Sequence, residues 1–155
     1  VFLFSDTIYR NITLGDDSIS IETVIQAAKD FGAHHFISQL PGAYNYNVME
    51  RGAMLSVGQR QLISFIRAYV HNPTILVLDE ATSSIDTESE DIIQKALAKL
   101  MEGRTSIVIA HRLATIQSAK KILVLEKGKI LEIGSHQELL ENDGHYKTLF
   151  DLQFN

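Results

Sequence analysis

The chain has 155 residues, 14 basic and 19 acidic side chains, a formal net charge of -5 and no cysteine. An acidic chain with no segment dense in Lys and Arg argues against nucleic acid as a main ligand, and the lack of cysteine excludes a disulfide framework and a thiolate metal site. Its length and its 45% hydrophobic content suffice for one globular domain with its own core.

The first third of the chain is predicted to be helical. It begins with the apolar stretch Val1–Phe4, which we interpret as the middle of a longer chain. After the polar loop Gly15–Ser18, apolar residues at helical spacing predict a helix over Ile21–Phe31. A second short helix is expected near His34–Gln39, before Pro41-Gly42 interrupts the pattern.

The middle of the chain predicts a capped helix followed by a buried strand. Ser56 is the expected N-cap, with Gln59 as its capping-box partner. Asn72-Pro73 ends the helix, and the continuous apolar run Ile75–Leu78 is typical of a strand buried on both faces of a parallel sheet. The amphipathic spacing comes from Leu62, Phe65, Ile66, Tyr69 and Val70.

Strands and helices then alternate. A helix is predicted over Thr87–Met101, with Thr87 and Glu90 as a second capping box. Two further buried strands, Ser106–Ala110 and Ile122–Leu125, flank a short helix near Leu113–Ser118. The order strand, helix, strand, helix, strand indicates α/β winding.

The last part of the chain predicts a hairpin and two helices. Glu126–Lys129 has the composition of a tight turn into a strand over Ile130–Ile133, which would form an antiparallel hairpin at the edge of the sheet. Gly134-Ser135 then leads to helices near His136–Leu140 and Tyr146–Gln153.

An acidic pair, Asp79-Glu80, follows the first predicted strand. Ligands of wound α/β sheets bind at the carboxyl ends of the strands. One carboxylate there can hold Mg²⁺ on a nucleotide, and a second can orient or deprotonate a water. Taken alone, the pair favours the simpler interpretation, a strand end that leads into a solvated loop.

A possible anion site lies at Leu55–Gln59. Glycine beside a helix start permits close approach to the backbone, and the free N–H groups and helix dipole favour an anion such as phosphate. The alternative is an ordinary N-cap serine next to a permissive glycine.

Four blocks in this order closely resemble the ABC ATPase family. They are Leu-Ser-Val-Gly-Gln, the amphipathic helix, Ile-Leu-Val-Leu-Asp-Glu-Ala-Thr-Ser-Ser-Ile-Asp, and Ile-Ala-His-Arg. Ser56–Gln59 matches the signature motif, Ile75–Asp79 the Walker B strand, Glu80 the catalytic carboxylate, Ser83–Asp86 the D-loop and His111 the switch histidine. Val57 departs from the family, which more often has glycine there, and we expect altered affinity at most.

The resemblance implies an α/β fold: a P-loop NTPase-like parallel sheet core, incomplete in this chain, with an inserted helical subdomain and a C-terminal hairpin and helices. The helical, signature-bearing subdomain is expected at 15–72. Residues 1–14 and 73–155 are expected to belong to the catalytic core.

The resemblance also implies ATP and Mg²⁺ as cofactors and a second nucleotide-binding domain packed head to tail. Asp79 would hold the metal, and Glu80 and His111 would act on the ATP of the same domain. The residues expected to clamp the partner's ATP, or to join the two sites, are Ser56, Val57, Gly58, Gln59 and Asp86.

The phosphate-binding loop Gly-x-x-x-x-Gly-Lys-[Ser/Thr] does not occur in these 155 residues. The only Gly-Lys pair, Gly128-Lys129, lies in the predicted hairpin turn. We therefore expect the isolated chain to be inactive and the activity to belong to a longer protein.

Glu50-Arg51-Gly52 resembles a loop that touches the membrane domain in exporter-type members, although it also fits a charged surface turn. The resemblance thus implies an exporter with a transmembrane domain, the chain lying at the cytoplasmic face of the membrane. Import, and a homodimer or a heterodimer, stay open. The alternatives are a soluble ABC ATPase of DNA repair or chromosome maintenance, for which a coiled-coil insertion would be expected, and a non-catalytic regulatory module.

Overall fold

The computed structural model describes residues 2–49, 52–79, 87–109 and 113–154. The chain divides into two compact units, Val1–Val108 (unit 1) and Ile109–Asn155 (unit 2), each of which is described by itself. Among the described helices, none is both long and apolar enough to cross a membrane.

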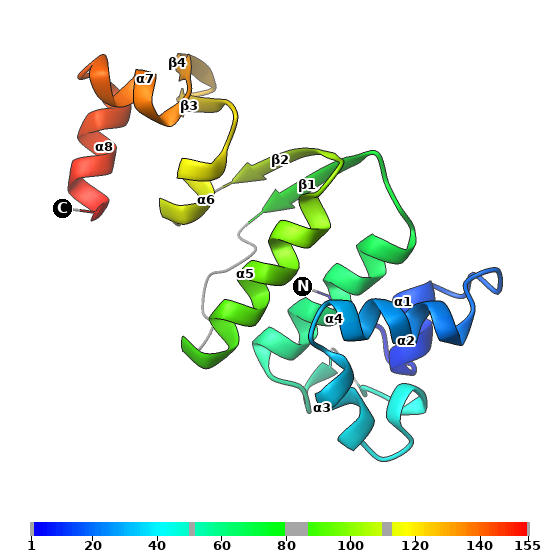
Figure 1. The fold of residues 1–155 in the computed structure, drawn as a ribbon. Coiled ribbons are helices and arrows are strands. Elements are labelled where there is room, and N and C mark those ends of the chain that lie inside the picture. Colours follow the sequence, from blue (N-terminus) through cyan, green and yellow to red (C-terminus); the bar gives the residue numbers. More distant parts are fainter. Residues whose placement is uncertain (1, 50–51, 80–86, 110–112, 155) are drawn as a thin grey trace. The chain divides into compact units, whose positions relative to one another are not determined.

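Unit 1 contains most of the helices (Figure 1). The predicted helices and the first two strands are confirmed, with bounds that differ by one or two residues. Helix α5 begins at Thr87, and the predicted capping box of Thr87 and Glu90 stays a prediction. The elements are α1 (Ile8–Thr13), α2 (Ile21–Asp30), α3 (His34–Gln39), the 3-10 helix η1 (Ala43–Asn45), α4 (Val57–Val70), β1 (Ile75–Asp79), α5 (Thr87–Met101) and β2 (Thr105–Ile109).

Helix α4 lies at the centre of the helical part and packs against α1, α2 and α5. Its predicted apolar face is buried at Leu62, Phe65 and Ile66, and Ile63 adds a fully buried side chain. These residues belong to one continuous apolar cluster that also includes Val24 of α2 and Leu100 of α5. The helical part therefore has a core of its own.

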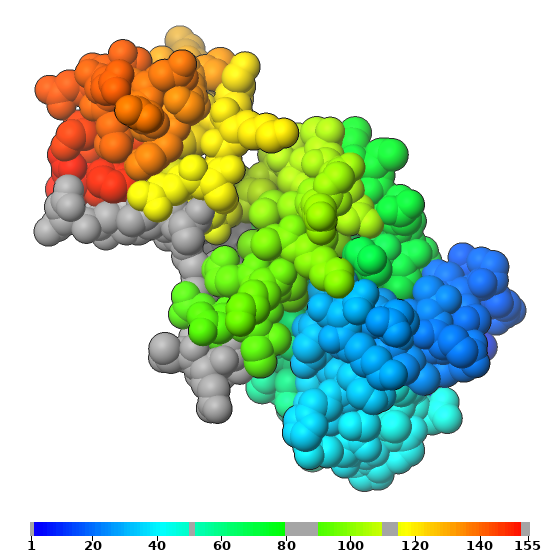
Figure 2. Space-filling view, viewed as in Figure 1, coloured from blue at the N-terminus to red at the C-terminus, as the bar shows by residue number. Residues whose placement is uncertain are grey.

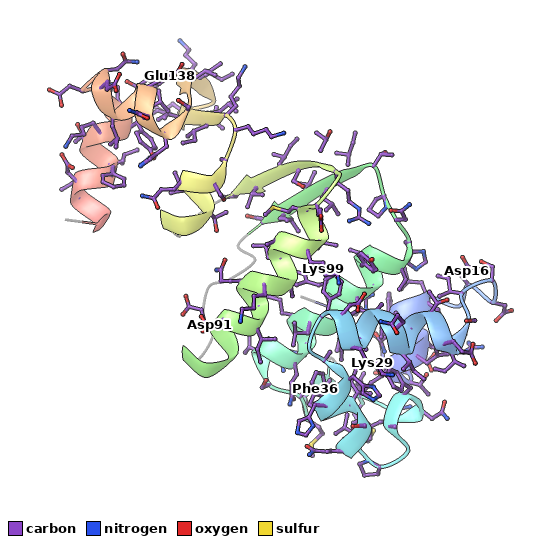
Figure 3. All side chains as sticks on the ribbon, in the orientation of Figure 1. Asp16, Lys29, Phe36, Asp91, Lys99 and Glu138 are labelled. Carbon is purple, nitrogen blue, oxygen red and sulfur yellow. The ribbon has the colours of Figure 1, made fainter. Side chains whose placement is uncertain are left out.

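An ion pair joins α2 and α5 at the surface. Lys99 Nζ lies 3.2 Å from Asp30 Oδ2, and Figure 3 shows Lys99 on α5. Figure 2 shows the same neighbourhood as a continuous surface, with the blue atoms of α2 against the green atoms of α5.

A buried polar network attaches the N-terminal segment to α4. Asn11 is fully buried, and its side chain accepts a hydrogen bond from Phe4 N (2.8 Å) and donates to Phe4 O (2.9 Å) and Thr7 O (3.0 Å). From α4, Arg67 donates to Asn11 O (2.6 Å), Asn11 Oδ1 (3.2 Å) and Phe2 O (3.1 Å). Burial lowers the pKa of Arg67. The network pairs Phe4 N and Asn11 O, two backbone groups that would otherwise need another partner.

Strands β1 and β2 lie side by side in a small parallel sheet, and their arrows point the same way in Figure 1. Leu76 and Leu78 pack on the helical core. On the opposite face Ile75, Val77 and Ile107 are 59–69% exposed. In the part of the chain that the structure describes, the prediction that these strands are buried on both faces is therefore wrong, because the helices of unit 1 pack against one face and leave these side chains of the other exposed.

Unit 2 contains a hairpin and three helices. The predicted turn is confirmed: Glu126 pairs with Lys129, and Lys127 and Gly128 both have positive φ (48° and 75°), as a two-residue turn of this kind requires. The strand expected at Ile122–Leu125 as the third strand of one wound sheet pairs instead with the strand at Lys129–Gly134, in a separate two-stranded sheet. The elements are α6 (Leu113–Ser118), β3 (Ile122–Glu126), β4 (Lys129–Gly134), α7 (His136–Glu141) and α8 (His145–Phe154).

Glutamate side chains cap the N-termini of the two terminal helices of unit 2. Ser135 and Glu138 form a capping box at the start of α7, and the hydrogen bonds from Ser135 lower the pKa of Glu138. Glu132 of β4 accepts the backbone N–H groups of His145 (3.1 Å) and Tyr146 (2.8 Å) at the start of α8. Beneath these caps lies a small apolar cluster of Val124, Leu139 and Tyr146.

Candidate active site

The first part of the candidate site is the turn into α4. Ser56 Oγ accepts the N–H of Gln59 (3.1 Å), and Gln59 Oε1 accepts the N–H of Ser56 (3.0 Å), so the predicted capping box is confirmed. This reciprocal pair fixes the backbone of the first turn. The Gln59 side chain is bonded to its own helix.

The side chains of this turn differ in exposure. Ser56 is exposed and Val57 is 42% exposed, whereas Gly58 is buried. Because the branched side chain of Val57 lies at the surface, its departure from glycine causes no crowding inside this chain. The exposed positions lie at the positive end of a 14-residue helix, where an anion is favoured.

The segment before this turn is also fixed. Leu55 is 4% exposed. Arg60 of α4 reaches back and donates through Nη1 to Leu55 O (2.5 Å) and Gly52 O (3.4 Å). Sequence reasoning missed Arg60, because an arginine after the signature carries no sign that its partners are backbone carbonyls.

The second part of the candidate site is the carboxyl end of the β1–β2 sheet. Asp79 is the last residue of β1 and is exposed. In a parallel sheet the carboxyl end of β2, at Ile109, lies at the same edge. The predicted residues Glu80, Asp86 and His111 lie outside the described residues.

Asp79 has the chemistry that magnesium prefers. Mg²⁺ is bound through one or two carboxylates plus waters and substrate phosphates, rather than by a cage of protein side chains. In the part of the chain that the structure describes, no group of three His, Cys, Asp or Glu side chains could hold a metal ion. The exposed carboxylate of Asp79 at the end of β1 is compatible with a Mg²⁺ ion that also binds nucleotide phosphates.

A family model described as "ABC transporter" matches residues 2–83, which is more than half of the chain. The chain belongs to the ABC transporter family. The match includes the capped turn of α4, strand β1 and Asp79.

Curated relatives cover almost all of this chain. It is 53% identical over 153 residues to the ATP-dependent lipid A-core flippase of Legionella pneumophila, an alignment that covers 99% of the chain and 26% of the flippase. It is 53% identical over 152 residues to ABC transporter B family member 15 of Arabidopsis thaliana, covering 97% of the chain and 12% of that relative. The chain thus spans about a quarter or less of these relatives.

A solved structure supports the fold. A bacterial Atm1-family ABC exporter with ATP bound aligns with 99% of the chain and 27% of its own, at 43% identity and a TM-score of 0.87. This agreement confirms the α/β ABC ATPase fold class expected from the sequence.

Proposed function

We propose that this chain is the signature-bearing and Walker B-bearing part of an ABC transporter that binds and hydrolyses ATP to drive export across a membrane. The observation that carries the proposal is the alignment of nearly the whole chain with an ATP-bound ABC exporter at 43% identity. The name of the flippase relative points the same way, towards ATP-dependent movement of a substrate.

Two groups of residues would serve two different ATP molecules. Asp79 would hold Mg²⁺ on the ATP of this domain, Glu80 would orient and deprotonate the attacking water, and His111 would contact the γ-phosphate. When bound, Mg²⁺ would neutralise charge on the phosphates. The exposed end of β1 at Asp79 supports this assignment.

The second group faces a partner. The turn Ser56–Gln59 would clamp ATP held by a second nucleotide-binding domain, and Asp86 would help to join the two sites. The exposure of Ser56 and Val57 at a helix N-terminus supports an anion contact from outside this chain.

We also propose 15–72 as the helical subdomain and 1–14 with 73–155 as part of the catalytic core.

The proposed setting is a transporter at the cytoplasmic face of a membrane, with a transmembrane domain as partner. The isolated chain is proposed to be inactive, because the loop that grips the β- and γ-phosphates does not occur in its sequence. No long coiled-coil sequence separates the strand blocks, so the DNA-repair alternative has no support.

The test is Glu80→Gln in the complete transporter. We expect ATP binding to persist and hydrolysis to fall by about 10² to 10⁴-fold, because a general base is lost while the phosphate contacts remain. Nucleotide binding is measured with a fluorescent ATP analogue and turnover by phosphate release.

The matched control is Glu102→Gln, which removes an exposed carboxylate at the end of α5. We expect this variant to retain wild-type turnover. Loss of nucleotide binding in Glu80→Gln, or full activity of that variant, would contradict the assigned role.

A further inference from the structure

The peptide between Leu55 and Ser56 is held on both sides. Its carbonyl oxygen, Leu55 O, accepts a hydrogen bond from Arg60 Nη1 at 2.5 Å. Its N–H, Ser56 N, donates a hydrogen bond to Gln59 Oε1 at 3.0 Å. The donor, Arg60, and the acceptor, Gln59, both belong to the first four residues of α4. The direction in which Ser56 leaves the loop is therefore set by two side chains, of which only Gln59 belongs to the signature.

Arg60 also contacts Gly52, at the start of the loop that leads to Ser56. Gly52 has φ +68°, and a Cβ at this position would lie 2.9 Å from Leu3 Cδ1 and 3.1 Å from Arg60 Cδ. Leu3 is 1% exposed. Gly52 is thus packed between a buried leucine and the arginine stem, while its carbonyl accepts a bond from the arginine head at 3.4 Å.

We infer that Arg60 is a positioning residue for ATP use: it fixes the Gly52–Leu55 loop so that Ser56 is presented to the ATP of the partner domain. This inference rests on the proposed function. Arg60 itself touches no nucleotide in this account and acts only through the backbone before Ser56. A charge-assisted hydrogen bond to a carbonyl is stronger than a neutral one, and here it adds to the turn bond from Leu55 N to Gly52 O (2.9 Å).

The test is Arg60→Met in the complete transporter. Methionine keeps much of the aliphatic stem beside Gly52 but loses both hydrogen bonds. Without them the turn samples other orientations, and ATP must select the productive one. We expect the KM for ATP to rise about tenfold, with kcat at saturating ATP within about twofold of wild type. Arg60→Lys, which keeps a cationic donor, should restore KM to within about threefold of wild type.

A matched control is Arg67→Met, seven residues along the same helix. Arg67 holds Asn11 and Phe2 and makes no bond to the Gly52–Leu55 loop. This variant should lower the melting temperature while leaving the KM for ATP near wild type. An equal rise in KM for both variants would show that any weakening of α4 has this effect and would overturn the inference.

A second variant approaches the loop from its other side. Gly52→Ala should raise KM as Arg60→Met does, because its Cβ displaces the loop from Leu3 and the Arg60 stem, in a backbone conformation that L residues resist. If Arg60→Met does not fold, Gly52→Ala and Arg60→Lys decide the matter. An unchanged KM in Gly52→Ala would then overturn the inference.

The two proposals fail in different ways. A complete wild-type transporter without ATP hydrolysis would sink the proposed function itself. A wild-type transporter that hydrolyses ATP, together with an Arg60→Met variant of unchanged KM, would overturn only the role of Arg60.

Discussion

The helical part of unit 1 and the hairpin of unit 2 are stabilised in different ways. Helices α1 to α5 share one continuous apolar cluster. In the strands of the hairpin, Val124 is buried, whereas Leu123, Leu125 and Ile130 remain 51–65% exposed. The helices of unit 1 thus bury a large shared apolar core, whereas the hairpin strands of unit 2 bury few of their apolar side chains.

The largest expected effect on the free energy of unfolding comes from making the same substitution, isoleucine to alanine, in each of the two regions. Ile63→Ala should lower the free energy of unfolding by about 2–5 kcal/mol, because it leaves a cavity in the helical core. Ile130→Ala, at a residue that is 52% exposed on β4, should cost about 0.5 kcal/mol or less. Urea denaturation followed by circular dichroism measures both. Equal losses would break the comparison.

The buried network of Asn11 gives the next effect. Asn11→Ala should cost about 1–3 kcal/mol, because it leaves the N–H of Phe4 and Nη2 of Arg67 without the oxygen that accepts from them at a fully buried side chain. The control Asn142→Ala removes an exposed side chain in unit 2 and should change little. The same denaturation assay applies, and similar costs for the two variants would show that the Asn11 bonds contribute no net stability.

A smaller and local effect is expected at α8. Glu132→Ala removes the acceptor of two helix N-terminal N–H groups, which is comparable to losing an N-cap and costs about 0.5–2 kcal/mol. Hydrogen exchange of the His145 and Tyr146 amides should accelerate, while amides of α4 keep their protection. Glu126→Ala at the hairpin turn is the control. Faster exchange throughout α4 would show that the effect is not confined to unit 2.

The smallest effect appears only at high pH. Burial raises the pKa of Tyr44 from its ordinary value of 10.0 to about 12, so the folded state retains a proton that the unfolded state loses. Stability is full below pH 10 and falls as pH rises from 10 towards 12. The free energies of unfolding of wild type and Tyr44→Phe should therefore converge or cross in this window. A pH-independent difference would contradict the shifted pKa.

The sequence predicted the elements that depend on local pattern and capping. Helix α4 is one example, because the pair Ser56 and Gln59 and the apolar spacing after it are local signals. The hairpin turn at Lys127-Gly128 is another, because positive φ at both positions strongly favours glycine in one of them.

Other features could not be predicted because they depend on distant backbone. Arg60 and Arg67 look alike in the sequence, yet one holds the loop before the signature and the other holds the N-terminal segment. An apolar run such as Ile75–Leu78 shows that both strand faces can be buried, but not whether this chain supplies both covers. The roles of Glu80, Asp86 and His111 stay predictions.

The most direct test of the account compares phosphate release from the purified 155-residue chain and from the complete transporter at saturating ATP and Mg²⁺. We predict turnover only from the complete transporter, because the chain contains no phosphate-gripping loop. Steady hydrolysis by the isolated chain that Glu80→Gln abolishes would contradict the central claim that these residues act on ATP only as part of a longer protein.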